Sequence, residues 1–354
     1  MLPVVDDEPG PPRRPPSRRL LWVLPGAAAV ALVVGVLQAE EPPAPPRTEA
    51  VAGAPLPELD EPSGARLLAL TDDGFVLVDV DLRVSLPVDL PPPGRPGAVV
   101  ERRGAAVVVS AGRAWAMLST AHLVELGAAD AAFASEAPDR VWLATADGVR
   151  EVGLDGAVLR QVPGVPATAA AGGGLVVSAS GGMELHDAGT GALVHRVGPL
   201  PPLVDAGGPW VVAADREELR CEVEVVDARS GGRRRTVRVA PYRTCLQGRS
   251  AVSPDGRLLA LPVAEYVHGQ GTRHGRLVLV ELASGRVTTV PRTERPVPIF
   301  SSLTWSPSGE WLFWADPVGG QPLAAHRLGG DGAVALRPAG LAPGSVRGVW
   351  AIVG

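Results

Sequence analysis

A forty-residue segment, residues 251–290, restricts the possible folds more than any other part of the sequence. The tetrapeptide Ser-Pro-Asp-Gly at 253–256 predicts a tight turn. Proline presets φ at the first central position, aspartate favours the second, and glycine accepts a positive φ at the exit. Apolar runs follow at 258–263 and 277–282, and a turn at 283–285 precedes a last run that ends at Val290. The segment predicts four antiparallel strands in about 40 residues, which is the length of a propeller blade.

A short signature recurs along the chain: an apolar strand that ends in an acidic residue and is followed by a glycine turn. Clear copies occupy 185–191 (LHDAGTG), 225–231 (VVDARSG) and 279–285 (LVELASG), and looser ones occupy 152–156 and 328–332. The acidic side chain can accept hydrogen bonds from the amides of the turn, and the glycine can take the left-handed conformation that closes a bulged hairpin. The signature therefore predicts the hairpin formed by the last two strands of each unit.

The spacing of these signatures divides the chain into repeats. Six units are complete: 97–129, 131–162, 166–198, 203–240, 245–290 and 298–338. Residues 65–90 supply only three strands, and residues 346–353 supply a lone strand at the other end. Together these two pieces complete a seventh unit, which closes a ring and leaves few unpaired strand edges. The predicted fold is all-β: a seven-bladed β-propeller over residues 65–354, closed by its C-terminal strand.

Two of the units resemble a known family. Residues 252–260 (VSPDGRLLA) and 305–312 (WSPSGEWL) resemble the SPDG-type repeat of TolB-like and WD-repeat-like β-propellers. The Gly-His and Trp-Asp pairs of true WD repeats are absent, and so is the additional N-terminal domain of TolB. The resemblance implies the propeller fold and a binding role, and it carries over no functional residue.

Composition is consistent with this fold. Hydrophobic residues make up 46% of the chain, which is enough for a sizeable core, and 43 glycines and 37 prolines punctuate short β-branched runs. The net charge of −5 gives no support to nucleic-acid binding, which normally requires a basic domain.

The N-terminal region predicts a membrane anchor. Residues 1–19 form a polar tail rich in proline and arginine, and residues 20–38 form a transmembrane helix, because 18 uncharged residues span roughly 27 Å of a bilayer. Arginines precede this stretch and glutamates follow it, so the positive-inside rule predicts a cytoplasmic N-terminus and a single-pass protein in the cell membrane. A proline-rich linker, 39–64, leads to an extracytoplasmic propeller. The alternatives are a cleaved signal peptide or a twin-arginine export signal.

Cys221 and Cys245 are the only cysteines. In an extracytoplasmic domain, two cysteines about 25 residues apart favour a structural disulfide. Cys221 opens the third strand of the fifth blade and Cys245 opens the first strand of the sixth, so both cysteines enter from one face of the ring.

Sequence motifs for catalysis and for metal or cofactor binding are absent. No HExxH, CxxC, GxSxG or P-loop occurs, so we expect no cofactor and no metal site. The six histidines show no metal-ligand spacing: His122, His186, His195, His268, His274 and His326.

One polar insert, 264–275, exceeds what a minimal blade requires. It carries aromatic, charged and imidazole side chains and shares a face with the inter-blade segments 242–243 and 292–295. Such side chains, grouped on one rigid face, suit partner recognition, although a solvated loop is the alternative. The candidate binding residues are Tyr242, Arg243, Glu265, Tyr266, His268, Arg273 and His274.

The sequence therefore predicts a non-enzymatic extracytoplasmic binding or scaffold propeller that mediates protein–protein or cell-envelope interactions. An alternative is a propeller-type hydrolase or lyase with its site at the central channel, since a fold alone does not determine function. A third hypothesis is a sensor that signals through its cytoplasmic tail. The sequence does not identify the ligand.

Overall fold

The structure is a computed structural model of the 354-residue chain. It describes residues 58–59, 61–88, 98–102, 104–120, 122–179, 181–201, 203–214, 221–232, 234–239, 244–245, 250–267, 271–293, 295–296, 302–315 and 322–353. Over these ranges the chain forms strands and turns, and no helix there is long and apolar enough to cross a membrane. The predicted tail (1–19), the predicted transmembrane helix (20–38) and residues 39–57 of the predicted linker lie outside the described residues.

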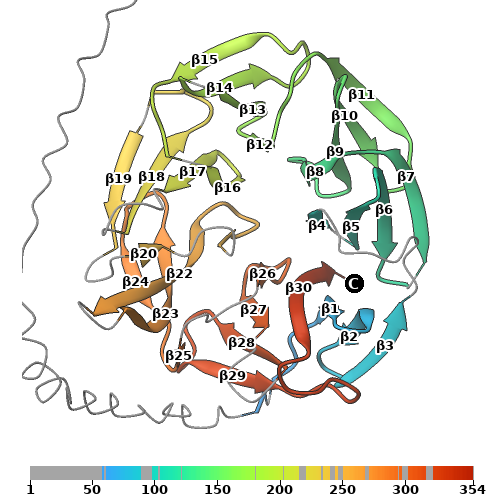
Figure 1. Ribbon diagram of the computed structural model, residues 1–354, viewed down its shortest axis with the longest axis vertical. Helices are drawn as coiled ribbons and strands as arrows, with labels where there is room; N and C mark the ends of the chain where they lie inside the picture. The colour runs from blue at the N-terminus through green and yellow to red at the C-terminus, as the bar shows by residue number, and fades with distance from the viewer. Residues whose placement is uncertain are drawn as a thin grey trace, which may run out of the picture. The chain divides into compact units, whose positions relative to one another are not determined.

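The strands form seven antiparallel sheets that are arranged in a ring (Figure 1), which confirms the prediction of a seven-bladed propeller. We number the blades along the chain and the strands of each blade from the centre outward. Blade 1 runs from β30 (Val346–Val353) through β1 (Ala65–Thr71) and β2 (Gly74–Asp79) to β3 (Val84–Val88).

The next four blades follow the predicted units. Blade 2 contains β4 (Ala98–Arg102), β5 (Ala105–Ser110), β6 (Arg113–Leu118) and β7 (Leu123–Ala128); blade 3 contains β8 (Ala131–Ala134), β9 (Arg140–Thr145), β10 (Gly148–Gly153) and β11 (Val158–Pro163). Blade 4 contains β12 (Ala169–Ala171), β13 (Gly174–Ala179), β14 (Gly182–Asp187) and β15 (Leu193–Val197); blade 5 contains β16 (Leu203–Gly207), β17 (Trp210–Ala214), β18 (Glu222–Asp227) and β19 (Arg234–Arg238).

Blade 6 has six strands, and blade 7 has four. Blade 6 contains β20 (Thr244–Cys245), β21 (Ala251–Val252), β22 (Leu258–Val267), β23 (Gly271–Glu281), β24 (Val287–Thr289) and β25 (Arg295–Pro296). Blade 7 contains β26 (Leu303–Trp305), β27 (Trp311–Ala315), β28 (Leu323–Arg327) and β29 (Ala333–Leu336).

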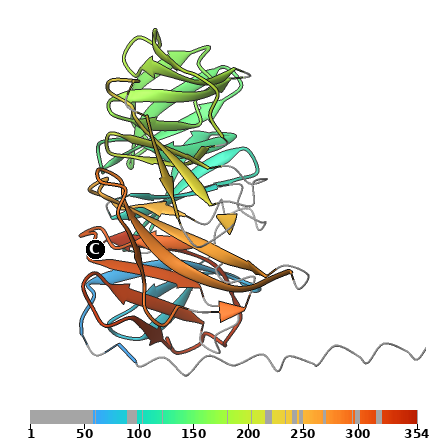
Figure 2. The same cartoon turned by 90° about the vertical axis from the view of Figure 1, so that its left-hand side faces the viewer.

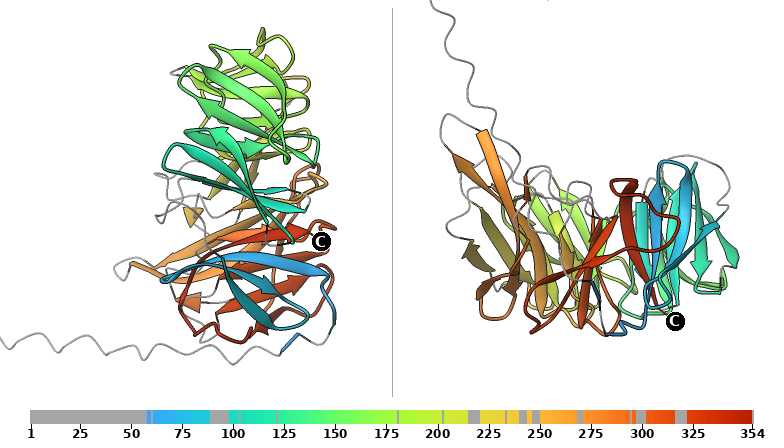
Figure 3. Two further views of the ribbon diagram at one scale, coloured as in Figure 1. Left: turned by 90° about the vertical axis from the view of Figure 1, so that its right-hand side faces the viewer. Right: turned by 90° about the horizontal axis from the view of Figure 1, so that it is seen from below.

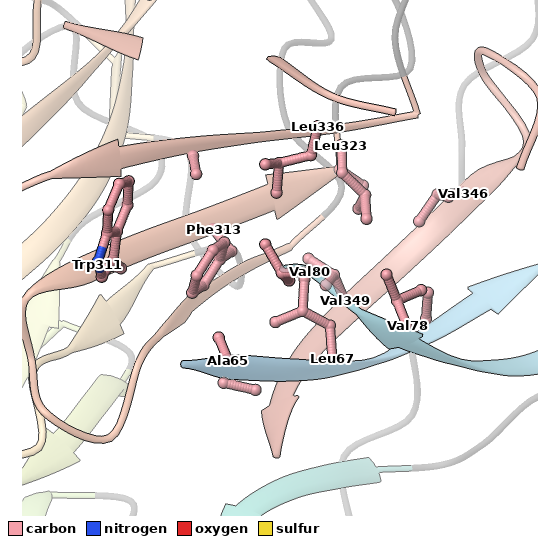
Figure 4. Close-up of a cluster of buried hydrophobic side chains, with 14 of the residues drawn as sticks. Ala65, Leu67, Val78, Val80, Trp311, Phe313, Leu323, Leu336, Val346 and Val349 are labelled. Carbon is pink, nitrogen blue, oxygen red and sulfur yellow. The ribbon is translucent and has the colours of Figure 1, made fainter. Parts of the chain in front are cut away.

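The hydrophobic core is divided into seven clusters, and each cluster lies between two neighbouring blades. A blade therefore buries both faces of its middle strands, which explains why these strands have continuous apolar runs. Figure 4 shows the cluster between blades 7 and 1, where Phe313 of blade 7 meets Leu67 and Val349 of blade 1.

The Ser-Pro-Asp-Gly turn of blade 6 has the conformation that its sequence predicts. The amide of Gly256, with φ of 69°, donates to the carbonyl of Ser253 over 2.8 Å, and the buried Ser253 hydroxyl accepts from the amide of Leu258 over 2.9 Å. Blade 7 repeats this arrangement, since the amide of Gly309 donates to Ser306 O over 2.8 Å. The serine fixes the start of the second strand in both blades.

The recurring hairpin also has the predicted chemistry. In blade 4, Asp187 Oδ1 accepts from the amides of Gly189 and Thr190 over 3.0 and 2.7 Å, and from the Thr190 hydroxyl over 2.8 Å. The threonine hydroxyl and these amides lower the pKa of Asp187 because they stabilise its charged form. Gly191, with φ of 73°, closes the turn.

The ring is closed by strands from the two ends of the propeller sequence. β30 pairs antiparallel with β1 from Ala65↔Val353 to Thr71↔Val346, with a register shift before Thr71. Its buried side chains fill the joint with blade 7, as Val349 does in Figure 4. The pairing predicted for the C-terminal strand is present.

Two segments differ from the sequence-based expectation. The polar insert 264–275 is not a loop, because β22 and β23 continue through it as a paired hairpin up to Val267↔Gly271. The predicted linker 39–64 ends earlier than expected, because Leu59 is only 8% exposed and belongs to the core between blades 7 and 1.

Candidate functional site

One long hairpin distinguishes blade 6 from the other blades. β22 and β23 contain 10 and 11 residues. The equivalent second and third strands of the other blades contain five to seven. The hairpin, orange in Figure 2, extends beyond one face of the ring, and the two views of Figure 3 show the same projection. The hairpin is therefore the most prominent departure from a flat propeller face in the described structure.

The base of the hairpin is rigid. Leu261, Val263, Leu277 and Val278 are fully buried between blades, so the root of each strand is fixed by packing. Two short strands flank the root: β20 pairs with β22 at Cys245↔Val263, and β25 pairs with β23 at Gly275↔Arg295. The short strands β20 and β25 therefore lie beside the hairpin root, whereas the expected neighbours 242–243 lie outside the described residues.

A disulfide connects the base of the hairpin to blade 5. Cys221 and Cys245 are joined, with a Cα–Cα distance of 4.9 Å, and both residues are buried. Cys245 lies in β20 and Cys221 directly precedes β18, which confirms the predicted bridge. The bridge lies where the inner strands of blade 6, β20 and β21, are only two residues long each.

Asp205 on β16 makes a second connection between blades 5 and 6. Its Oδ2 accepts from the amide of Val252 in β21 over 2.7 Å, and its Oδ1 accepts from the amide of Ala206 over 2.8 Å. The loss of water around the carboxylate raises the pKa of Asp205 to about 6, despite the two amide hydrogen bonds that favour its charged form.

The chain leaves blade 6 through a fixed corner. The buried Thr293 hydroxyl donates to Val290 O over 2.7 Å and accepts from the amide of Leu277 over 3.1 Å. Arg292 adopts a left-handed φ of 60° in the same corner. These constraints direct β25 along the hairpin.

The structure places some of the predicted binding residues and not others. Glu265 and His274 form a register pair on the hairpin, and Tyr266 pairs with Thr272, so Arg273 lies between the two pairs. Tyr242, Arg243 and His268 lie outside the described residues. The backbone thus brings four predicted residues onto one two-stranded ribbon, and their role in binding stays a prediction.

Sequence reasoning did not identify Asp205, nor the ion pair of Glu58 with Arg83 beside Leu59. Asp205 lies in the middle of β16, where no local sequence pattern distinguishes it, and its contact with blade 6 depends on the closed ring. Within the described ranges, no three His, Cys, Asp or Glu side chains are grouped so that they could hold a metal ion.

Comparisons with known proteins relate the chain to other propellers. No family model matches the sequence, and no curated protein matches it significantly. TolB from Acinetobacter baumannii is 14% identical, with 80% of this chain and 81% of TolB covered and a TM-score of 0.44. A Lactobacillus plantarum protein is 14% identical, with 81% and 98% covered and a TM-score of 0.49. Kluyveromyces lactis Hsv2 is 10% identical, with 66% and 75% covered and a TM-score of 0.48. These likenesses concern the fold alone.

Proposed function

We propose that this chain is a non-enzymatic binding or scaffold propeller, tethered outside the cell membrane by residues 20–38, and that the β22–β23 hairpin contacts a protein or cell-envelope partner. The observation that carries the proposal is the length of the two hairpin strands, 10 and 11 residues, whereas the described second and third strands of the other blades have five to seven. A projecting ribbon on a rigid scaffold is a typical recognition element, because the scaffold bears the cost of ordering it before binding.

The way the base is held supports this role. A two-stranded ribbon alone is marginally stable in water, so a projecting one needs a fixed root. Here the root has buried side chains, two flanking strands and a disulfide to the next blade. The root therefore positions the distal residues of the hairpin, and only the root belongs to the core.

The disulfide also supports the proposed location. Structural disulfides persist in oxidising compartments and are rare in the cytosol. The apolar stretch at 20–38, with arginines before it and glutamates after it, is the proposed tether.

Site-specific photo-crosslinking in cells tests the binding role. A photoreactive phenylalanine at position 266 should give a discrete higher-mass adduct, because Tyr266 lies on the projecting part of the hairpin. The same residue at Leu159, exposed on the outer strand of blade 3, is the matched control and should give none. Adducts of equal yield at both positions would reject the hairpin as the contact surface.

A register-preserving deletion separates binding from folding. Ala264 and Gly275 are paired, so an Asn-Gly turn can replace residues 265–274 and still close a two-residue hairpin. We expect the melting temperature to change by only about 2–3 °C, because the removed residues are distal to the buried root. The adduct partner found at position 266 should no longer co-purify. A much larger loss of stability would show that the ribbon is part of the core.

A further inference from the structure

The turn between β2 and β3 of blade 1 is a variant of the recurring hairpin turn. Leu82 N donates to Asp79 Oδ1 over 2.9 Å, as Thr190 N donates to Asp187 Oδ1 in blade 4. Leu82 therefore occupies the tip position that is a threonine in blade 4. An aliphatic residue thus stands in place of a polar one in this exposed turn, and Leu82 is 70% exposed.

The next residue in this turn, Arg83, has an unfavourable backbone conformation. Arg83 has φ of 56°, in the place where blade 4 has Gly191 with φ of 73°. A residue with a Cβ pays a conformational cost in this region, and such a residue persists where the surrounding structure requires it. The amide of Ala339 donates to Arg83 O over 2.8 Å and holds the backbone in place.

The side chain of Arg83 makes contacts that a glycine at this position could not make. Its Nη1 donates to Glu58 Oε2 over 3.0 Å, and its Nη2 donates to Leu59 O over 2.8 Å. Ser63 and Gly64 donate their amides to the carboxylate of Asp81 over 2.7 and 2.8 Å. We call residues 58–59 and 61–64 the clasp, because they fasten the start of the propeller to this turn.

The clasp fixes the point from which the proposed tether leaves the propeller. Glu58 forms a parallel bridge with Ala335 on the outer strand of blade 7, and Leu59 is buried between blades 7 and 1. The chain upstream of Glu58 therefore departs from the perimeter of the ring beside the Leu82 turn. About 19 linker residues separate this point from the apolar stretch, a reach of at most about 60 Å if fully extended as polyproline.

The perimeter at this point is apolar. Leu82, Val84 and Leu86 are 70%, 40% and 58% exposed along the turn and outer strand of blade 1. The charged groups around them balance in number. Arg83 and Arg337 contact Glu58, and Arg327 contacts Glu61. The carboxylate of Asp81, next to Leu82, accepts hydrogen bonds from the amides of Ser63 and Gly64. This rim, Leu82, Val84 and Leu86, therefore presents aliphatic side chains without a strong net charge.

Resting on the proposed function, we propose that the blade 1 rim docks on the lipid surface beside the tether. The tether holds the rim near the bilayer, so the rim has a high effective concentration at the lipid surface. A small aliphatic contact is then sufficient for docking. Turns between the third and fourth strands lie on the face of the ring opposite to those between the second and third, because the strands alternate in direction. The β22–β23 hairpin thus points away from the bilayer when Leu82 faces it.

Lipid photolabelling of the full chain tests this inference. The chain is reconstituted in phosphatidylcholine–phosphatidylglycerol vesicles that contain a diazirine lipid reactive at the interface, and labelled peptides are identified by mass spectrometry. We expect about fivefold more label on residues 82–86 than on 158–159 or 193–194, which are exposed aliphatic pairs on blades 3 and 4. L82S/L86S should lower the rim label about threefold, whereas V158S/L159S should not change it.

The outcomes separate this inference from the proposed function. Label on 20–38 without label on 82–86 would overturn the rim contact and leave the tether intact, whereas absence of label on both would reject the tether and the rim together. Equal label on the rims of blades 1, 3 and 4 would show random collision and overturn the inference. Because the contact is aliphatic and the surrounding charges balance, the rim label should persist in 0.5 M salt, which screens surface charges beyond about 4 Å. A photoreactive leucine at position 82 can also be tested in native membranes. If it captures a protein instead of lipid, the inference of a lipid contact is overturned.

Discussion

Two joints of the ring are fastened by different means. Between blades 7 and 1, an eight-residue strand, β30, completes blade 1, and Leu59 of the clasp packs into the same core. Between blades 5 and 6, the inner strand is broken into β20 and β21, and a disulfide and the Asp205 carboxylate make the connection. The first joint depends on continuous pairing and packing, and the second depends on a few localised bonds.

The difference between the two joints follows from the elements that lie next to each of them. At the joint between blades 7 and 1, every residue of β1 from Ala65 to Thr71 has a register partner in β30. The joint between blades 5 and 6 is next to the root of the long hairpin, and β20 pairs with the hairpin strand β22. The disulfide adds a covalent connection between blades 5 and 6 at this point, which a disulfide does mainly by restricting the unfolded chain.

Removal of residues 343–354 should give the largest effect. It deletes β30, opens the ring, and exposes the buried partners of Val349 and Ile352 in blades 7, 1 and 2. Each large buried side chain contributes about 1.5–3 kcal/mol, so the lost burial is of the same order as the roughly 5–15 kcal/mol that stabilises a typical domain, and we expect aggregation or proteolysis. Limited proteolysis and calorimetry measure the effect. A soluble truncation that melts cooperatively near the full-length temperature would show that β30 does not close the ring.

The double variant C221A/C245A should give the second largest effect. The bridge closes a loop with a sequence separation of 24, so its loss costs about 3.5 kcal/mol and lowers the melting temperature by roughly 10 °C. Hydrogen exchange should accelerate in β20 and β22 and stay slow in β1 and β30. Equal acceleration at both joints would contradict the independence of the two fastenings.

A change of pH should alter the contribution of Asp205 to the free energy of unfolding, by a smaller amount than the loss of the disulfide. The pKa of Asp205 is raised to about 6, so its contribution to stability is complete below pH 3.8 and is lost as the pH rises through 6, by at most about 3 kcal/mol. Urea unfolding of the wild type and of D205N from pH 4 to 7 measures this term as the difference between their curves. His326, whose pKa burial lowers, acts in the opposite sense below pH 6.5, and it cancels in that difference. Parallel curves would contradict the raised pKa.

The blade count was predictable because local turn chemistry repeats in sequence. Gly256, Gly191 and Gly285 mark turns whose hydrogen bonds involve neighbouring residues only, so the sequence contains all that the turn requires. The C-terminal strand was predictable for a different reason: an apolar alternation at one end matched a missing strand at the other. Both signals are independent of the three-dimensional path of the chain.

The clasp and the projecting hairpin were not predictable in the same way. Leu59 lies in a stretch of prolines and acidic residues that has no strand-like alternation of apolar residues, and its buried site forms only when blades 7 and 1 meet. Arg83 was missed because a left-handed turn position is recognised by glycine. The polar composition around Tyr266 indicated a loop, although the β-favouring residues Val267 and Thr272 on either side of a glycine-containing stretch are compatible with a hairpin.

The pairing of β1 with β30 has a consequence for biosynthesis. Ala65 pairs with Val353, so a contact that blade 1 requires joins the first and last residues of the propeller. A nascent chain emerges from its N-terminal end, and blade 1 stays one strand short until translation of the propeller is complete. Contacts this distant in sequence also slow folding, because chain entropy is lost before they form. The open edge of β1 is therefore the segment that a chaperone has to shield for the longest time.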